Sequence, residues 1–147
     1  MPDIEHSLQI EAKPEQIYPL FSSGSGFTKW WAKDVTKKAG GRIDIGFFDR
    51  STVYSFQLKK TSKPRYVEWL CRSKEEEWNG TRILFDLKKG ESNAETILRF
   101  SHAGWKARTE YFVSCNTVWG ELMFRLKSVA ENRKRTNPLF AKSDWNP

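Results

Sequence analysis

The chain has 147 residues, the length of one domain, and a formal net charge of +7. That charge favours anionic partners in general, but the basic residues are spread along the chain, so we expect a solvated basic surface and not nucleic-acid binding. There is no run of 18 apolar residues and no apolar segment in the N-terminal MPDIEHSLQI, so neither a membrane span nor a secretory signal is expected.

In chain order, six segments alternate apolar and polar residues, as strands with one buried face do. They are residues 4–10, 43–47, 52–60, 67–71, 83–87 and 96–102. Between the first two segments, Pro14 predicts the start of one short helix, and a second is expected over residues 27–32, after the Ser/Gly run 22–26. Asn79-Gly80 is typical of a tight hairpin turn. Short turns between successive strands predict an antiparallel sheet.

Residues 109–134 contain no proline and predict one long amphipathic helix, which at about 25 residues would span roughly 37 Å. At 100° per residue, the apolar side chains fall on one stripe: Phe112, Cys115, Trp119, Leu122, Met123, Leu126, Val129 and Ala130. Val113 and Phe124 lie off this stripe and predict a contact surface, so the protein is expected to be a monomer or a homodimer. We expect a single domain over residues 1–137 and a polar, loosely held tail over 138–147.

Ten Phe, seven Trp and four Tyr supply most of the bulk available for a core. A solid aromatic core and a cavity lined by rings both fit this composition. The two cysteines, Cys71 and Cys115, have no metal-ligand spacing and are expected to be buried thiols of a cytoplasmic protein.

The predicted order is one strand, two short helices, five strands and a long helix. A set of residues along this order carries a resemblance to a known family. These residues are Ala12, Pro14, Glu15, Ile17, Tyr18, Trp30, Trp31, Pro64, Arg65, Tyr66, Val67, Trp69, Thr96, Leu98, His102, Gly104, Phe112, Trp119 and Leu126. Together they resemble the START-like superfamily (SRPBCC, Bet v 1-like). Within it they are most similar to the branch named for the C-terminal domain of the activator of heat-shock protein 90 ATPase. The resemblance covers about residues 4–133.

The resemblance implies an α+β helix-grip fold, in which a curved six-stranded antiparallel sheet wraps around the long C-terminal helix. It also implies a cavity between sheet and helix for apolar or amphipathic molecules. The residues expected to line it are Trp30, Trp31, Phe47, Tyr54, Phe56, Trp69, Phe85, Phe100, His102, Trp105, Phe112, Cys115, Asn116, Trp119 and Met123. Asp44 and Glu68 alternate outward and are expected at the surface.

The leading hypothesis is therefore a cytoplasmic protein that binds a small hydrophobic or amphipathic molecule, such as a lipid, without catalysing a defined reaction. The family branch adds a chaperone-associated regulator, with a role in stress responses, as an alternative. The co-chaperones that name the branch carry a further N-terminal domain, so direct ATPase stimulation is not expected here. A polyketide-cyclase-like enzyme would use His102 and Tyr54 as its acid–base pair. Motifs for metal, phosphate or other cofactors are missing from the sequence, so none is expected.

Overall fold

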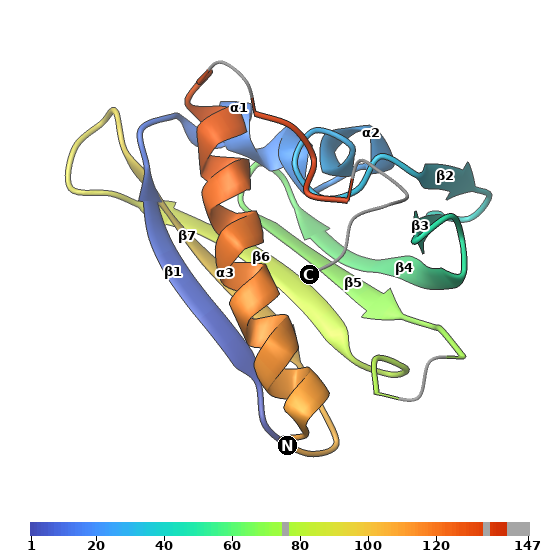
Figure 1. The fold of residues 1–147 in the computed structure, drawn as a ribbon. Coiled ribbons are helices and arrows are strands. Elements are labelled where there is room, and N and C mark those ends of the chain that lie inside the picture. Colours follow the sequence, from blue (N-terminus) through green and yellow to red (C-terminus); the bar gives the residue numbers. More distant parts are fainter. Residues whose placement is uncertain (75–76, 134–135, 141–147) are drawn as a thin grey trace.

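The computed structural model describes residues 1–74, 77–133 and 136–140. One curved sheet lies behind a long helix that crosses it from end to end, and the short helices sit at one end (Figure 1). The elements follow in the order β1 (Ile4–Ile10), α1 (Pro14–Ile17), η1 (Tyr18–Leu20), α2 (Gly24–Phe27), β2 (Val35–Lys38), β3 (Arg42–Phe47), β4 (Thr52–Ser62), β5 (Tyr66–Cys71), β6 (Arg82–Lys89), β7 (Thr96–Ala103) and α3 (Glu110–Ala130).

Within the described part of the chain, the sheet has the strand order β1-β7-β6-β5-β4-β3-β2, and every neighbouring pair is antiparallel. The α+β helix-grip architecture is thus confirmed, with seven strands in place of the six expected. The additional strand is β2, whose residues Val35–Lys38 are largely exposed and pair with β3 at the sheet edge.

The second short helix forms earlier than the sequence predicts. Ser23 caps α2, and its hydroxyl oxygen accepts a hydrogen bond from the Gly26 N–H at 3.2 Å. The Ser/Gly run that was expected to precede the second helix therefore begins it, and Trp30-Trp31 lie in the turn that follows the helix. At Gly26 a Cβ atom would stand 2.1 Å from the Pro19 carbonyl oxygen, so glycine is required for the backbone approach there.

The core lies between the sheet and α3, and over β5, β6 and β7 it is packed solidly with rings. Phe21 stacks on Phe85 with ring centroids 4.7 Å apart. The buried indole of Trp30 donates to the Leu20 carbonyl oxygen at 2.8 Å, and that of Trp69 donates to the Phe21 carbonyl oxygen at 3.0 Å. The core thus keeps these indole N–H groups satisfied while it buries their rings.

The long helix α3 begins at Glu110, after Thr109, whose hydroxyl accepts the Phe112 N–H at 3.1 Å. It ends at Ala130, four residues before the predicted end. Its buried face is most of the predicted stripe: Phe112, Cys115, Trp119, Leu122, Met123 and Leu126. No helix in the described residues combines the length and the apolar character needed to cross a membrane.

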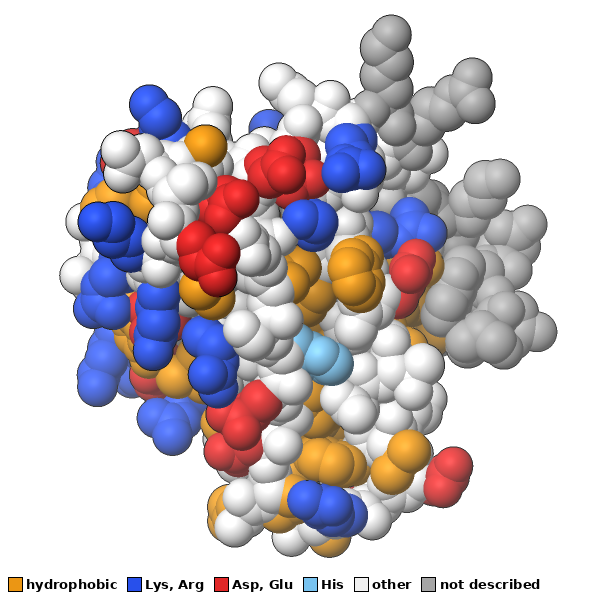
Figure 2. Space-filling model, turned by 90° about the vertical axis from the view of Figure 1, so that its left-hand side faces the viewer, with side chains coloured by type: hydrophobic (Ala, Val, Ile, Leu, Met, Phe, Trp, Pro, Cys, Tyr) orange, Lys and Arg blue, Asp and Glu red, His pale blue; other side chains and the backbone are white. Residues whose placement is uncertain are grey.

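Lys and Arg side chains gather along one side of the molecule, with Asp and Glu side chains among them (Figure 2). Asp44 is on the surface side of its strand, 4.0 Å from the Lys38 ammonium. The expectation that Glu68 is exposed is wrong, because only 5% of its surface is accessible. Its carboxylate accepts hydrogen bonds from Tyr66 at 2.9 Å and from Arg82 at 3.2 Å. A buried carboxylate needs such partners, which the alternation of the strand does not reveal.

Candidate functional site

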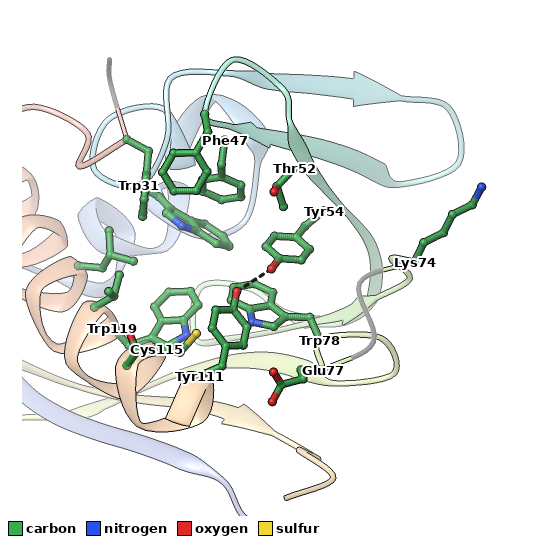
Figure 3. Close-up of a pocket in the computed structure, with 15 residues that line it drawn as sticks. Trp31, Phe47, Thr52, Tyr54, Lys74, Glu77, Trp78, Tyr111, Cys115 and Trp119 are labelled. Carbon is green, nitrogen blue, oxygen red and sulfur yellow. Dashed lines mark hydrogen bonds between the residues drawn. The ribbon is translucent and has the colours of Figure 1, made fainter. Parts of the chain in front are cut away.

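A cavity of about 680 Å³ lies between the β3–β4 end of the sheet and the first half of α3 (Figure 3). Its volume falls within the range typical of small-molecule sites. Most of its lining is aromatic or aliphatic: Trp31, Phe47, Phe48, Thr52, Tyr54, Lys74, Glu77, Trp78, Tyr111, Ser114, Cys115, Val118, Trp119, Leu122 and Phe140.

Five of the residues predicted to line a cavity do line this one: Trp31, Phe47, Tyr54, Cys115 and Trp119. Nine others are buried in the core and do not line it: Trp30, Phe56, Trp69, Phe85, Phe100, His102, Trp105, Phe112 and Met123. Asn116 is neither buried nor at the cavity, because the helix turns its side chain toward solvent. The cavity therefore occupies one end of the space between sheet and helix, and rings fill the rest.

His102 does not form an acid–base pair with Tyr54 in the cavity. It is fully buried, and its Nδ1 accepts the indole N–H of Trp119 at 3.0 Å. Nδ1 must therefore be unprotonated, so Nε2 carries the proton and donates to the Thr81 hydroxyl at 2.8 Å. That hydroxyl donates in turn to the Trp78 carbonyl oxygen at 2.6 Å. Burial lowers the pKa of His102 to about 3. The ring is a neutral link between helix and sheet.

Ten of the fifteen lining residues were not predicted to line a cavity, and among them Tyr111 and Trp78 contribute most to its inner wall. The hydroxyl groups of Tyr111 on α3 and Tyr54 on β4 are hydrogen-bonded at 2.7 Å, so a polar bridge joins helix to sheet (Figure 3). Trp78 belongs to the charged loop after β5, yet only 5% of it is exposed, and its indole stacks on the Tyr54 ring at 4.2 Å and 5°. A large aromatic side chain inside an otherwise charged loop was the available signal.

The inner wall of the cavity is electrically neutral. Burial raises the pKa of the Cys115 thiol to about 11. Burial, together with the hydrogen bond to Tyr54, also raises the pKa of Tyr111. Two opposite charges, Lys74 and Glu77, border the cavity, and the Lys74 side chain points away from it (Figure 3). The described residues contain no group of three or more His, Cys, Asp or Glu side chains that could hold a metal ion.

Two residues of the expected tail, Leu139 and Phe140, are hydrogen-bonded to the chain beside the cavity, and Phe140 forms part of its lining. Their N–H groups donate to the carbonyl oxygens of Trp30 at 3.2 Å and Trp31 at 3.0 Å. Phe140 then directs its ring edge-on to Phe47, with centroids 4.9 Å apart. A segment more than a hundred residues away in the chain thus supplies part of the cavity wall.

A curved antiparallel sheet, a terminal helix across it and a ring-lined cavity at one end define a helix-grip protein of the START-like class. The sequence profile of the family described as "Activator of Hsp90 ATPase homolog 1-like protein" matches residues 11–131. The chain therefore belongs to this family.

Solved structures agree with that assignment. The Aha1 dimer from Colwellia psychrerythraea is 31% identical, with a TM-score of 0.80, and the match covers 91% of this chain and 99% of that one. A Mesorhizobium loti protein is similar at 15% identity and a TM-score of 0.74, over 89% of this chain and 98% of its own. A Bacillus halodurans protein is similar at 22% identity and 0.67, with the same two coverages. No curated protein sequence matches the chain.

Proposed function

We propose that this protein binds a small, largely apolar molecule in the 680 Å³ cavity between the β3–β4 end of the sheet and α3. The supporting observation is that one part of the interior is solidly packed and another part is open. Rings pack face to edge at centroid distances such as 5.1 Å between Phe85 and Phe100, whereas the space beside Trp31 and Trp119 stays open. An apolar space of this size with a few polar groups is the usual form of a small-molecule site.

Thermal shift and tryptophan fluorescence titrations against panels of lipids and neutral aromatic compounds test the proposal. A ligand at about 100 times its Kd should stabilise the fold by about 2.7 kcal/mol. Val118 lines the cavity from α3, and V118F fills part of the space, so the affinity of any hit should fall about tenfold or more. T117F is the matched control, because Thr117 is exposed on the same helix and does not line the cavity.

Two results would contradict this proposal. An affinity that V118F leaves unchanged would place the ligand elsewhere on the protein. A protein that binds no member of either panel, by either measurement, would remove the proposal altogether.

A second candidate function is regulation of a chaperone ATPase, favoured by the family description and by the 31% identical Colwellia relative, which is named Aha1. ATP turnover by purified Hsp90 should then rise when this protein is added. Turnover that stays at its basal rate with tens of micromolar protein would exclude the candidate. V118F separates the two functions, because a chaperone contact outside the cavity is insensitive to it.

We also propose a homodimer, since the Colwellia relative was solved as a dimer. Phe124 is 63% exposed and Val113 is 52% exposed. They are eleven residues apart on α3, so they lie within about 20° of one line along the helix and roughly 16 Å apart. F124K should shift the sedimentation coefficient from dimer to monomer. A monomer already present in the unaltered protein at high concentration would refute the proposal.

A further inference from the structure

Two buried indole N–H groups, those of Trp78 and Trp105, have no hydrogen-bond partner among the described residues. The indoles of Trp30, Trp69 and Trp119, by contrast, all donate to an acceptor. An unpaired buried donor is costly and uncommon in a folded protein, so each case needs a reason. Of these two, Trp78 lines the cavity and Trp105 does not.

Trp78 lines the cavity, but its N–H is itself closed off from solvent by neighbouring side chains. Tyr54 stacks on the indole face at 4.2 Å, and its hydroxyl is bonded to that of Tyr111 at 2.7 Å. The polar neighbour of the N–H is the Cys115 sulfur, which is close enough for the indole N–H to lower the pKa of the thiol but lies outside hydrogen-bond geometry. A thiol sulfur is a weak acceptor, so the indole donor is left for another partner.

The surroundings define what that partner must be. An indole N–H donates and cannot accept, so the missing group is an acceptor. The thiol of Cys115 and the phenol of Tyr111, whose pKa values burial raises, show that this wall disfavours negative charge. The acceptor is therefore uncharged. Trp31, Tyr54 and Trp119 are among the rings that line the cavity, which suits an aromatic molecule.

We infer that the cavity takes a neutral, flat aromatic molecule bearing a hydrogen-bond acceptor such as a carbonyl oxygen, and that the indole N–H of Trp78 donates to that acceptor. This inference rests on the proposed binding function and narrows its ligand class. In the structure, Trp78 Nε1 is closed off from solvent. Tyr111, in the first turn of α3 and 39% exposed, is the neighbour with room to move, and its rotation away from Tyr54 admits the acceptor.

Two probes of nearly identical shape isolate the acceptor: 2-acetylnaphthalene, which has a carbonyl oxygen, and 2-isopropenylnaphthalene, which has a CH₂ group in its place. The quantity measured is the ratio of their Kd values, by calorimetry, in the unaltered protein, in W78F and in W105F. W78F should reduce the preference for the acetyl probe about three- to tenfold, the size of one net hydrogen bond. W105F removes an equally buried and unpaired N–H outside the cavity, and should leave the ratio unchanged.

The outcomes distinguish the role of Trp78 from the binding function itself. Binding of both probes with a ratio that W78F does not alter overturns the role of Trp78 and leaves the binding function standing. If neither probe nor any panel compound binds, both the role of Trp78 and the proposed binding function are overturned. If W78F does not fold, the indole region of the ¹⁵N–¹H spectrum of the unaltered protein decides. The Trp78 resonance, identified by its contacts to the bound probe, should shift downfield with the acetyl probe and not with its isopropenyl analogue. An equal shift with both probes counts against the inference.

Discussion

His102 is held neutral by its neighbours, and this state has a consequence for stability. Above about pH 6.5 the imidazole is neutral in both folded and unfolded chains. Between pH 6.5 and about 3, the unfolded chain takes up a proton that the folded one does not. The contribution of His102 to the free energy of unfolding is thus fully present above pH 6.5. It falls as the pH decreases, by up to about 1.4 kcal/mol per pH unit.

We predict that H102Q flattens this dependence. The glutamine amide offers an acceptor for Trp119 and a donor for Thr81, so the fold should persist, with a loss of about 1–3 kcal/mol at pH 7.5 from imperfect geometry. Urea unfolding at pH 7.5 and at pH 4.5 gives the two free energies for each protein. The difference between these pH values should shrink in H102Q. Curves that stay parallel would contradict the neutral, buried imidazole.

Single positions mark where sequence reasoning about the cavity succeeded and where it failed. Trp119 and Cys115 were found because helical spacing aligned them with the core stripe. Asn116 was placed by the same angle and is exposed, since one residue is about 100° of rotation and the edge of a stripe is poorly defined. Tyr111 lines the cavity from outside the stripe, through a hydroxyl bond to Tyr54 that no pattern contains. Polar contacts between distant elements are invisible to periodicity.

At the scale of elements, two glycines give opposite predictions for one substitution. In Gly26 a Cβ atom would meet backbone atoms of Pro19 and Leu20 at 2.1 and 2.8 Å. G26A should therefore lower the free energy of unfolding by about 3 kcal/mol or more. In Gly120, inside α3, the nearest contact is His6 Cε1 at 3.7 Å, an ordinary distance. G120A should raise stability by up to about 1 kcal/mol through helix propensity.

Chemical denaturation of both variants under one condition provides the comparison, and each serves as the control of the other. A neutral G26A would mean that the helix α2 and the turn before it separate readily. A destabilised G120A would mean that α3 lies closer to β1 than the 3.7 Å contact indicates.

The end of α3 is fixed to β1 through Glu131 and Lys127. The Glu131 carboxylate accepts the Glu11 N–H and the Lys127 ammonium, both at 2.8 Å, and the ammonium also donates to the Gln9 carbonyl oxygen at 2.5 Å. Burial alone would raise the pKa of Glu131, but these hydrogen bonds outweigh it and the pKa is lowered. The stabilisation is present above the ordinary pKa of a glutamate and is lost as pH falls through the lowered value.

E131Q should therefore cost about 1–3 kcal/mol at pH 7, because an amide replaces a carboxylate that accepts charged and backbone donors. The matched control is E121Q, which breaks an exposed pair with Arg125 four residues on and should cost less than about 0.5 kcal/mol. The two variants are compared by urea unfolding at pH 7 and again at pH 4. Equal losses at pH 7 would show that the link to β1 adds nothing beyond a surface ion pair.

The elements themselves were largely predictable, because period-two alternation and a long helical stripe follow directly from burial on one face. The strand β2 was not, since three of its four residues, Thr36, Lys37 and Lys38, are polar and exposed and show no alternation. An edge strand stabilised by backbone pairing with β3 needs no apolar face. The limits of α2 were missed for a related reason. Its glycines predict a break in the chain. In the structure Ser23 caps the helix and Gly26 packs closely on Pro19, so the glycines belong to α2.

At the scale of the molecule, sequence reasoning found the layers but could not divide the interior into solid core and open cavity. Rings on β5, β6 and β7 and rings on β3 and β4 have the same pattern in the chain. The difference arises from the curvature of the sheet, from Trp78 folding back over Tyr54 and from the C-terminal segment reaching Trp31. Each of these is a long-range contact, which is why composition allowed both a solid core and a cavity.

This division predicts different costs for removing rings from the two regions. F85A removes a fully buried ring that packs on Phe21 and Phe100, so its cost should be about 3–5 kcal/mol. F140A removes a half-buried ring at the cavity wall, while the backbone hydrogen bonds to Trp31 and Lys33 remain. Its cost should be nearer about 1 kcal/mol, because less apolar surface is exposed.

F140A should instead change how the cavity exchanges its contents. With the ring gone from its place against Phe47, a bound fluorescent probe should dissociate several-fold faster in stopped-flow competition. Its release should be unaffected by N116A, which truncates an exposed side chain of α3 that does not line the cavity. A loss of stability as large as that of F85A would make Phe140 part of the core. An unchanged dissociation rate would contradict a role for Phe140 in retaining the bound molecule.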